Sequence, residues 1–200
     1  MSTPEARNNH FLHISVILCR ILFSPLYVLK KEGTENIPKK SGFVLLPKHQ
    51  RWQDIPLLVL ASPKPLYFVA KYELFANPFI GPTLKALGGI PLNRRRPLQS
   101  RSSIGAVDRL LSKGEGIVVF PEGTYYRNRM GAGRIGMVRH ILTKGRLPFI
   151  PVGIKYDQKG PRTLVKVNFG LPLYGGPSDS AQKFLDRMMD EIAGLSGLKL

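Results

Sequence analysis

The chain has 200 residues, of which 43% are hydrophobic, so it is long enough to bury the core of one domain, and this composition excludes a collagen, a coiled coil and a disordered tail. Thirty Lys and Arg against 13 Asp and Glu give a net charge of +17, which favours nucleic acid, an anionic membrane surface or phosphate-bearing substrates as partners. The single cysteine, Cys19, cannot form an intramolecular disulfide, and no Cys/His cluster has zinc-site spacing, so we expect a reducing, cytosol-facing setting and no metal.

The most apolar segment covers residues 11–29. Arg20 lies in its middle, and its unbroken apolar runs fall far short of the roughly 20 residues that a membrane-spanning helix needs. A helix here places His13 and Arg20 on one side and leaves a broad apolar face. Two interpretations follow: a helix lying in a membrane interface, with Lys30 and Lys31 at its end facing lipid headgroups, or an amphipathic helix packed on the core. No signal-peptide cleavage site follows, so we do not expect secretion.

Beyond residue 40, short apolar runs alternate with segments of helical periodicity. The apolar runs predict strands at 42–47, 66–70, 90–92, 116–120, 149–154 and 164–169. The periodic segments predict helices at 55–61, 79–87, 99–111 and 135–142, and a final helix from 181 that ends at Gly194 or Gly197. The pattern predicts an α/β fold: a single domain at 36–200 with a mostly parallel central sheet flanked by helices, preceded by an amphipathic, membrane-associating segment at 1–35.

Polar residues follow the first predicted strand directly, in the sequence KHQRWQD at 48–54. The carboxyl end of a strand is the usual place for a site in an α/β domain. An imidazole such as His49 can take a proton from a hydroxyl near neutral pH, and a carboxylate such as Asp54 can hold its tautomer. The two side chains can meet only in a loop or a first helical turn, which this junction supplies. The alternative is that Asp54 caps the helix beside an unrelated surface histidine.

A second strand end carries FPEGT at 120–124. Pro121 stops strand pairing, Glu122 is an isolated acid in a basic neighbourhood, and Gly123 allows backbone N–H groups to approach a ligand. The alternative is an ordinary turn with a surface glutamate.

A third strand end carries GGIPLNRRR at 88–96, where three guanidinium groups could bind phosphate in a bidentate manner. The alternative is a solvated basic turn.

These blocks, in this order, resemble those of the PlsC-type glycerolipid acyltransferases, the family of 1-acyl-sn-glycerol-3-phosphate acyltransferases. KHQRWQD is similar to the family's His-x4-Asp block, and FPEGT is its third block intact. GGIPLNR at 88–94 looks like its Gly-x-Ile-Phe-Ile-Asp-Arg block, and FIPVGI at 149–154 like its fourth. KYEL at 71–74 also resembles the stretch between the first two blocks. The resemblance covers about residues 40–156.

The resemblance implies an O-acyltransferase in which His49 is the general base and Asp54 orients it. It further implies that Arg94, with Lys71 or Arg127, holds the phosphate of the acceptor.

By the same resemblance, Glu122, Gly123 and Thr124 would position the acceptor's polar backbone. Two departures from the family pattern concern Tyr125, which stands where Arg often follows the threonine, and Asn93, which stands where an acid is common.

The implied reaction transfers a fatty acyl group from acyl-CoA or acyl carrier protein to 1-acyl-sn-glycerol 3-phosphate, giving phosphatidic acid for phospholipid biosynthesis. No cofactor is implied. We expect a peripheral or monotopic protein on the cytoplasmic face of an anionic membrane.

Three other interpretations stay open. The enzyme could act on another acceptor, such as glycerol 3-phosphate or another lysolipid. The blocks could survive as the phosphate pocket of a non-catalytic lipid-binding module. The charge would also suit a basic nucleic-acid-binding protein, although no helix-turn-helix, zinc or RRM signature is present.

Overall fold

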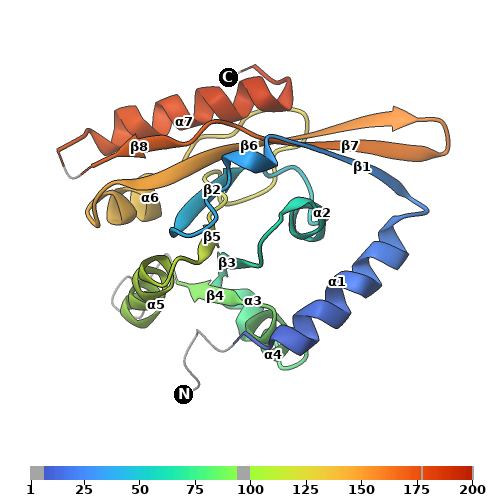
Figure 1. Ribbon diagram of the computed structural model, residues 1–200, viewed down its shortest axis with the longest axis horizontal. Coiled ribbons are helices and arrows are strands. Elements are labelled where there is room, and N and C mark those ends of the chain that lie inside the picture. The colour runs from blue at the N-terminus through green and yellow to red at the C-terminus, as the bar shows by residue number, and fades with distance from the viewer. Residues whose placement is uncertain (1–6, 94–99, 177, 200) are drawn as a thin grey trace.

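The computed structural model describes residues 7–93, 100–176 and 178–199 and shows the predicted α/β fold (Figure 1). In this part of the chain, one sheet has the strand order β1-β7-β6-β2-β5-β3-β4, and β8 pairs with β6. The strands are β1 (Tyr27–Glu32), β2 (Phe43–Pro47), β3 (Leu66–Lys71), β4 (Gly89–Leu92), β5 (Gly116–Val118), β6 (Leu147–Lys159), β7 (Arg162–Phe169) and β8 (Leu173–Gly175). The helices are α1 (Asn9–Phe23), α2 (Asp54–Ala61), α3 (Tyr72–Phe75), α4 (Ile80–Ala86), α5 (Arg101–Ser112), α6 (Ile135–Leu142) and α7 (Ala181–Ser196), with a 3-10 turn at Thr34–Asn36.

The centre of the sheet is parallel. Strand β2 pairs in parallel with β5 and β6, and β3 pairs in parallel with β5 and β4. The carboxyl ends of these five strands therefore point towards the same edge. Strand β6 is antiparallel to β7 and β8, so it ends the parallel part.

Both faces of the central strands are buried. Along β2, Val44 and Leu46 pack with α5, α6 and α7, while Phe43 and Leu45 pack on the opposite face with α2. This alternation is the two-residue period of a strand. Figure 1 shows α1 and α2 apart from α5 and α6, with the sheet between the two pairs. The near-continuous apolar sequence of β2 follows from this double burial.

The structure differs from the prediction at residues 11–29. Helix α1 ends at Phe23, and Tyr27–Glu32 forms strand β1, which pairs in parallel with β7. Pro25 has no backbone N–H with which to continue the helix. The placement of Lys30 and Lys31 at a helix end is therefore wrong, because both lie on an edge strand. The segment 1–35 thus contributes a strand to the sheet of the following domain.

Helix α1 presents apolar side chains on two sides. Leu12, Val16 and Cys19 line a pocket of about 210 Å³ against α2, β3 and α4. Burial raises the pKa of the Cys19 thiol, which agrees with a packing role. The opposite side exposes Ile14, Ile17, Leu18, Ile21 and Leu22. Within the described ranges, no helix combines the length and the apolar character needed to cross a bilayer.

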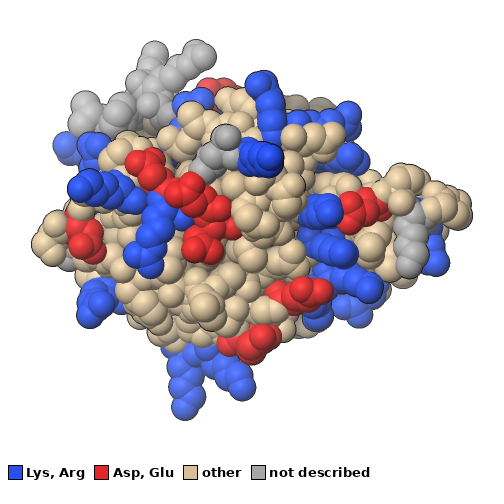
Figure 2. Space-filling model, turned by 90° about the horizontal axis from the view of Figure 1, so that it is seen from above, with Lys and Arg blue, Asp and Glu red and all other residues tan. Residues whose placement is uncertain are grey.

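The positive charge is not gathered in a single stripe on the face that Figure 2 shows. Lys and Arg lie there in several separate groups, with Asp and Glu between them. A recognition surface for nucleic acid would concentrate its basic residues on one face or one helix, so this face gives the nucleic-acid interpretation no support.

Candidate active site

The polar residues singled out in the sequence meet at the carboxyl edge of the parallel strands. His49 follows β2 and Glu122 follows β5, the next strand in the sheet. Lys71 ends β3, and its Cα is paired with that of Leu92 at the end of β4. The parallel topology therefore explains how blocks far apart in the sequence reach one place.

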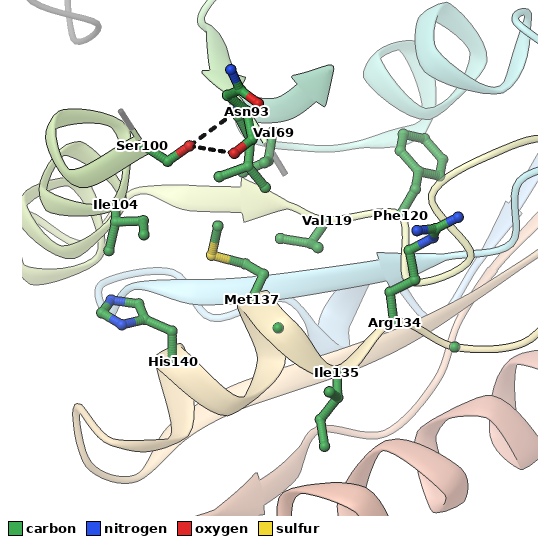
Figure 3. Close-up of a pocket in the computed structure, with 13 residues that line it drawn as sticks. Val69, Asn93, Ser100, Ile104, Val119, Phe120, Arg134, Ile135, Met137 and His140 are labelled. Carbon is green, nitrogen blue, oxygen red and sulfur yellow. Dashed lines mark hydrogen bonds between the residues drawn. The ribbon is translucent and has the colours of Figure 1, made fainter. Parts of the chain in front are cut away.

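A cavity of about 580 Å³ opens beside these strand ends (Figure 3). Its polar features are Asn93, whose backbone N–H and carbonyl both bond the Ser100 hydroxyl, together with Arg134 and His140. The remaining lining is mostly apolar and comes from β3 to β5, α5 and α6: Val69, Leu92, Ile104, Val119, Phe120, Ile135 and Met137.

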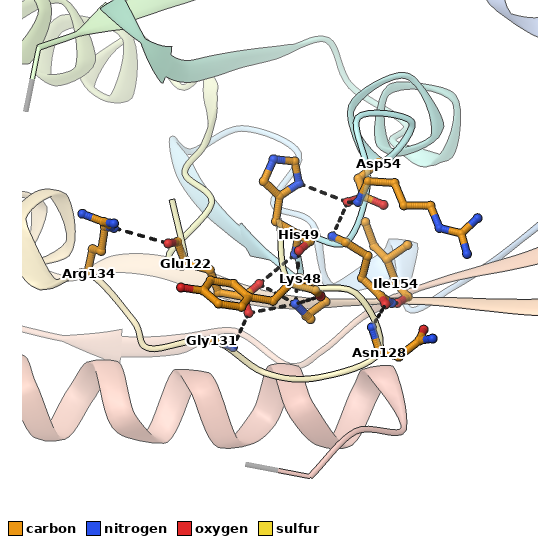
Figure 4. Close-up of polar contacts among 11 residues, drawn as sticks. Lys48, His49, Asp54, Glu122, Asn128, Gly131, Arg134 and Ile154 are labelled. Carbon is orange, nitrogen blue, oxygen red and sulfur yellow. Dashed lines mark hydrogen bonds and ion pairs between the residues drawn. The ribbon is translucent and has the colours of Figure 1, made fainter. Parts of the chain in front are cut away.

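His49 and Asp54 form a buried pair (Figure 4). The imidazole Nδ1 lies 3.0 Å from Asp54 Oδ2. The same oxygen accepts the backbone N–H groups of Gln50 at 2.6 Å and Arg51 at 2.7 Å. Asp54 is the first residue of α2, where the helix dipole also favours a negative charge. The loop thus brings the two predicted side chains together, and the proton that the ionised carboxylate holds on Nδ1 leaves Nε2 as an acceptor.

Two aromatic rings fix the plane of the imidazole. The Phe120 ring stacks on it with centroids 3.8 Å apart, and the Tyr125 ring meets it at an angle of 62° with centroids 4.4 Å apart. Phe120 also lines the cavity, so the cavity and the histidine share a wall. Burial, together with the charge of Asp54, raises the pKa of the Tyr125 phenol. Tyr125 therefore stays neutral beside the histidine.

Lys48 and Glu122 form a second buried pair, which the sequence did not suggest. Neither side chain is exposed, and Lys48 Nζ lies 2.8 and 2.7 Å from the two carboxylate oxygens. Glu122 also accepts the backbone N–H groups of His49 at 3.0 Å and Gly131 at 2.6 Å. Burial lowers the pKa of Lys48, and the bond to Glu122 opposes that change. The pair therefore joins the start of the loop at 48–53, which we call the histidine loop, to the loop at 121–131.

Both oxygens of Glu122 thus have partners within the protein, and its expected contact with an acceptor stays a prediction. Glu122, which is an isolated acid in the sequence, pairs with the buried Lys48, 74 positions earlier in the chain.

Gln50 and Tyr156 anchor the rest of the histidine loop. The Gln50 amide donates to the carbonyl of Ile154 at 2.8 Å and accepts the Asn128 N–H at 2.8 Å. The Tyr156 hydroxyl donates to Asp54 Oδ1 at 2.5 Å. The contacting residues Ile154 and Tyr156 lie on β6 and Asn128 lies in the loop at 121–131, and no short-range pattern connects them with residues 48–54.

The other described residues of the prediction lie in the loop at 121–131 or, for Lys71, at the end of β3. Gly123 is buried with φ of 68°, which favours glycine, and its N–H bonds the Phe120 carbonyl in a tight turn. Thr124 is half-buried, while Lys71 and Arg127 are exposed. Arg94 lies outside the described residues.

Arg134 is a cation that the sequence did not single out. Its Nε lies 3.3 Å from the Glu122 carbonyl, and its side chain lines the cavity (Figure 3). Its position ahead of a helix, twelve residues beyond Glu122, gave no signal on its own.

Among the described residues, no group of three or more His, Cys, Asp or Glu side chains is arranged to hold a metal ion.

Comparison with known proteins gives this geometry a context. A protein-family model described as Acyltransferase matches residues 28–155, which include the histidine loop, the cavity strands and the FPEGT turn. The chain belongs to the acyltransferase family. It is 33% identical over 151 residues to the 1-acyl-sn-glycerol-3-phosphate acyltransferase of Bacillus subtilis, covering 73% of this chain and 74% of that protein. It is 32% identical to the enzyme of the same name from Borreliella burgdorferi, over 71% of this chain and 57% of that one.

The fold comparison agrees. The crystal structure of the 1-acyl-sn-glycerophosphate (LPA) acyltransferase PlsC from Thermotoga maritima matches with a TM-score of 0.66 and 25% identity, covering 90% of this chain and 78% of that one. The resemblance of the sequence to the PlsC-type family is confirmed, and this acyltransferase is an O-acyltransferase.

Proposed function

We propose that this acyltransferase transfers a fatty acyl group from a thioester to the free hydroxyl of 1-acyl-sn-glycerol 3-phosphate, giving phosphatidic acid. The observation that carries the proposal is the buried His49–Asp54 pair, whose Nε2 is left to accept a proton at the carboxyl edge of the sheet. The names of the Bacillus, Borreliella and Thermotoga relatives support the choice of acceptor.

The proposed chemistry is direct transfer. The acceptor hydroxyl bonds His49 Nε2, and the imidazole takes its proton as the oxygen attacks the thioester carbon. Asp54 stabilises the imidazolium that forms. The tetrahedral oxyanion then collapses, the carbon–sulfur bond breaks, and the leaving thiolate takes the proton back from the imidazolium. No covalent acyl-enzyme is needed, since residues 48–54 contain no Ser or Cys.

The acceptor's phosphate is proposed to bind the cations around the cluster. Lys71 at the end of β3 and Arg127 in the 121–131 loop keep this role from the sequence analysis, as does Arg94. Arg134 joins them because its side chain lines the cavity that shares Phe120 with the histidine. A phosphate held there brings the free hydroxyl to the base and makes its attack effectively intramolecular.

The acyl chain of the donor is proposed to occupy the apolar part of the 580 Å³ cavity, which leaves Arg134 to the phosphate. Its mostly apolar lining suits a hydrocarbon, since burying each methylene contributes about 0.8 kcal/mol. A chain in the cavity would place its thioester next to the Phe120–His49 stack.

Helix α1 is proposed to lie in the membrane interface. Its outer side exposes Leu18, Ile21 and Leu22 among other apolar side chains, a pattern suited to the boundary between headgroups and acyl chains. Near its end, Phe23 packs edge-on against Trp52 with centroids 6.1 Å apart. Trp52 belongs to the loop between His49 and Asp54, so the membrane helix would adjoin the site where a lipid acceptor reacts.

Product analysis tests the substrate assignment. Purified protein and anionic vesicles are incubated with labelled acyl-CoA or acyl carrier protein and with one of four acceptors: 1-acyl-sn-glycerol 3-phosphate, glycerol 3-phosphate, a lysophosphatidylcholine or a lyso-aminolipid. We expect phosphatidic acid as the main labelled ester. An ester formed only with another acceptor would overturn the assignment while keeping the enzyme class.

A further inference from the structure

The carboxylate of Asp54 has a partner on each oxygen, and one of them is a side chain that no motif contains. Oδ2 faces the imidazole and two backbone N–H groups, whereas Oδ1 accepts the hydroxyl of Tyr156 at 2.5 Å. Tyr156 lies on β6, 102 positions beyond Asp54. A hydrogen bond to a charged acceptor is among the stronger polar contacts in a protein.

The strand holds Tyr156 firmly. Its residue pairs with Val165 of β7, and its ring packs against the buried core cluster on the α2 face of the sheet. The guanidinium carbon of Arg51 lies 4.4 Å from the centre of the same ring. The phenol ring thus packs between the sheet and the histidine loop.

The surroundings of Tyr156 keep its hydroxyl protonated. Burial and the charge of Asp54 raise the pKa of the phenol well above its ordinary value, which outweighs the opposing effect of Arg51. The hydroxyl therefore donates at every pH at which the enzyme would work.

We infer that Tyr156 is a positioning residue that holds the Asp54 carboxylate with Oδ2 towards His49 and thereby sets the basicity of the imidazole. The inference rests on the proposed role of His49 as base. Without the Tyr156 hydroxyl, Oδ1 loses its donor, and the orientation of the carboxylate depends on the three partners of Oδ2 alone.

Loss of this donor changes the attraction between Asp54 and a protonated His49 in a predictable direction. A hydrogen bond from Tyr156 withdraws negative charge from Asp54, so its removal strengthens the attraction between Asp54 and a protonated His49. The imidazole then keeps its proton to higher pH. The acidic limb of the pH profile of kcat/KM, which reports the free base, must therefore move to higher pH.

Other charged groups around the pair do not change this sign. Lys48, whose charge acts on the Asp54 side, is neutralised by Glu122, and Arg51 stays cationic throughout. The Tyr125 phenol, which faces the imidazole, keeps its proton. Tyr27 of β1, which faces Tyr156 itself, is present equally in both proteins compared.

The test compares Tyr156→Phe with Tyr174→Phe, which removes the same hydroxyl from an exposed position on β8. For Tyr156→Phe we expect kcat to fall about tenfold, because a carboxylate held through one oxygen orients the imidazole less precisely. KM for both substrates should stay within about twofold, since the hydroxyl touches neither. The acidic limb and the NMR titration of the His49 imidazole should both move to higher pH. Tyr174→Phe should match the parent protein throughout.

A wild-type kcat and pH profile in Tyr156→Phe would overturn the inference, as would a lower kcat without any movement of the acidic limb or the imidazole titration. Circular dichroism melting defines the temperatures at which both variants are folded, and Tyr156→Met replaces the phenylalanine variant if the latter does not fold. His49→Ala is measured in the same assay. If it retains parental activity, the proposed base fails; if it is inactive while Tyr156→Phe is normal, only the positioning role fails.

Discussion

The Lys48–Glu122 pair cross-links two strand ends in a site with no exposure of either side chain, and replacing Lys48 with methionine should destabilise the protein strongly. Methionine keeps an unbranched apolar stem but lacks the ammonium group, so the substitution leaves Glu122 charged and buried with only the N–H groups of His49 and Gly131 to bond it. Removing one partner of a buried pair costs about 3–5 kcal/mol. That is a large share of the roughly 5–15 kcal/mol by which a domain is stable.

Urea unfolding followed by circular dichroism measures this loss. The matched control is Lys144→Met, which breaks the 2.8 Å contact of a lysine with Asp108 where the lysine side chain is 42% exposed, and it should cost less than about 1 kcal/mol. Adding Glu122→Gln to Lys48→Met removes the unpaired negative charge and should restore at least about 1 kcal/mol of the free energy of unfolding. A Lys48→Met variant that loses no more stability than the control would refute the reasoning.

Three further predictions concern the membrane, the cavity and the half-buried Tyr156. Leu22→Asp on α1 should reduce binding to anionic vesicles in a flotation assay, whereas Leu171→Asp, at a similarly exposed leucine, should not; equal loss in both would contradict the interface role. Ile104→Trp fills part of the cavity and should lower kcat/KM for long-chain donors more than for short-chain ones, and an unchanged preference across chain lengths would exclude the cavity as the acyl site. The raised pKa of Tyr156 means that the folded protein binds the phenol proton more tightly than the unfolded chain, so the free energy of unfolding should fall as the pH rises past 10.0. Tyr156→Phe should reduce the slope of this free energy against pH by up to about 1.4 kcal/mol per pH unit. Identical slopes for the two proteins in urea titrations at alkaline pH would contradict this effect of burial.

The strands could be predicted where their apolar pattern lies within a few consecutive residues. Residues 43–47 and 149–154 are apolar on both faces because helices cover both sides, and short runs of that kind between turns are typical of buried parallel strands. Strand β1 was missed because its first residues continue the apolar pattern of α1. Its partner β7 lies more than 130 residues away, and only that pairing makes Tyr27–Glu32 a strand.

In the candidate site too, contacts between residues close in the sequence could be predicted and contacts across the sheet could not. His49 and Asp54 are five positions apart, so the turn between β2 and α2 could be expected to join them. Lys48 and Glu122 are 74 positions apart, and Tyr156 meets Asp54 only through the register of β6. A basic residue before a histidine and a tyrosine after an apolar run carry no signal of their partners, because the sheet topology supplies those contacts.

The central claim is that the imidazole of His49 takes the proton of the attacking hydroxyl, and the turnover of His49→Ala tests it most directly. Single-turnover transfer from a labelled thioester to 1-acyl-sn-glycerol 3-phosphate is measured with the parent protein and the variant at equal vesicle binding and equal melting temperature. Loss of a general base predicts a rate lower by about two to four orders of magnitude. A variant that forms labelled phosphatidic acid within a few-fold of the parental rate would contradict the claim.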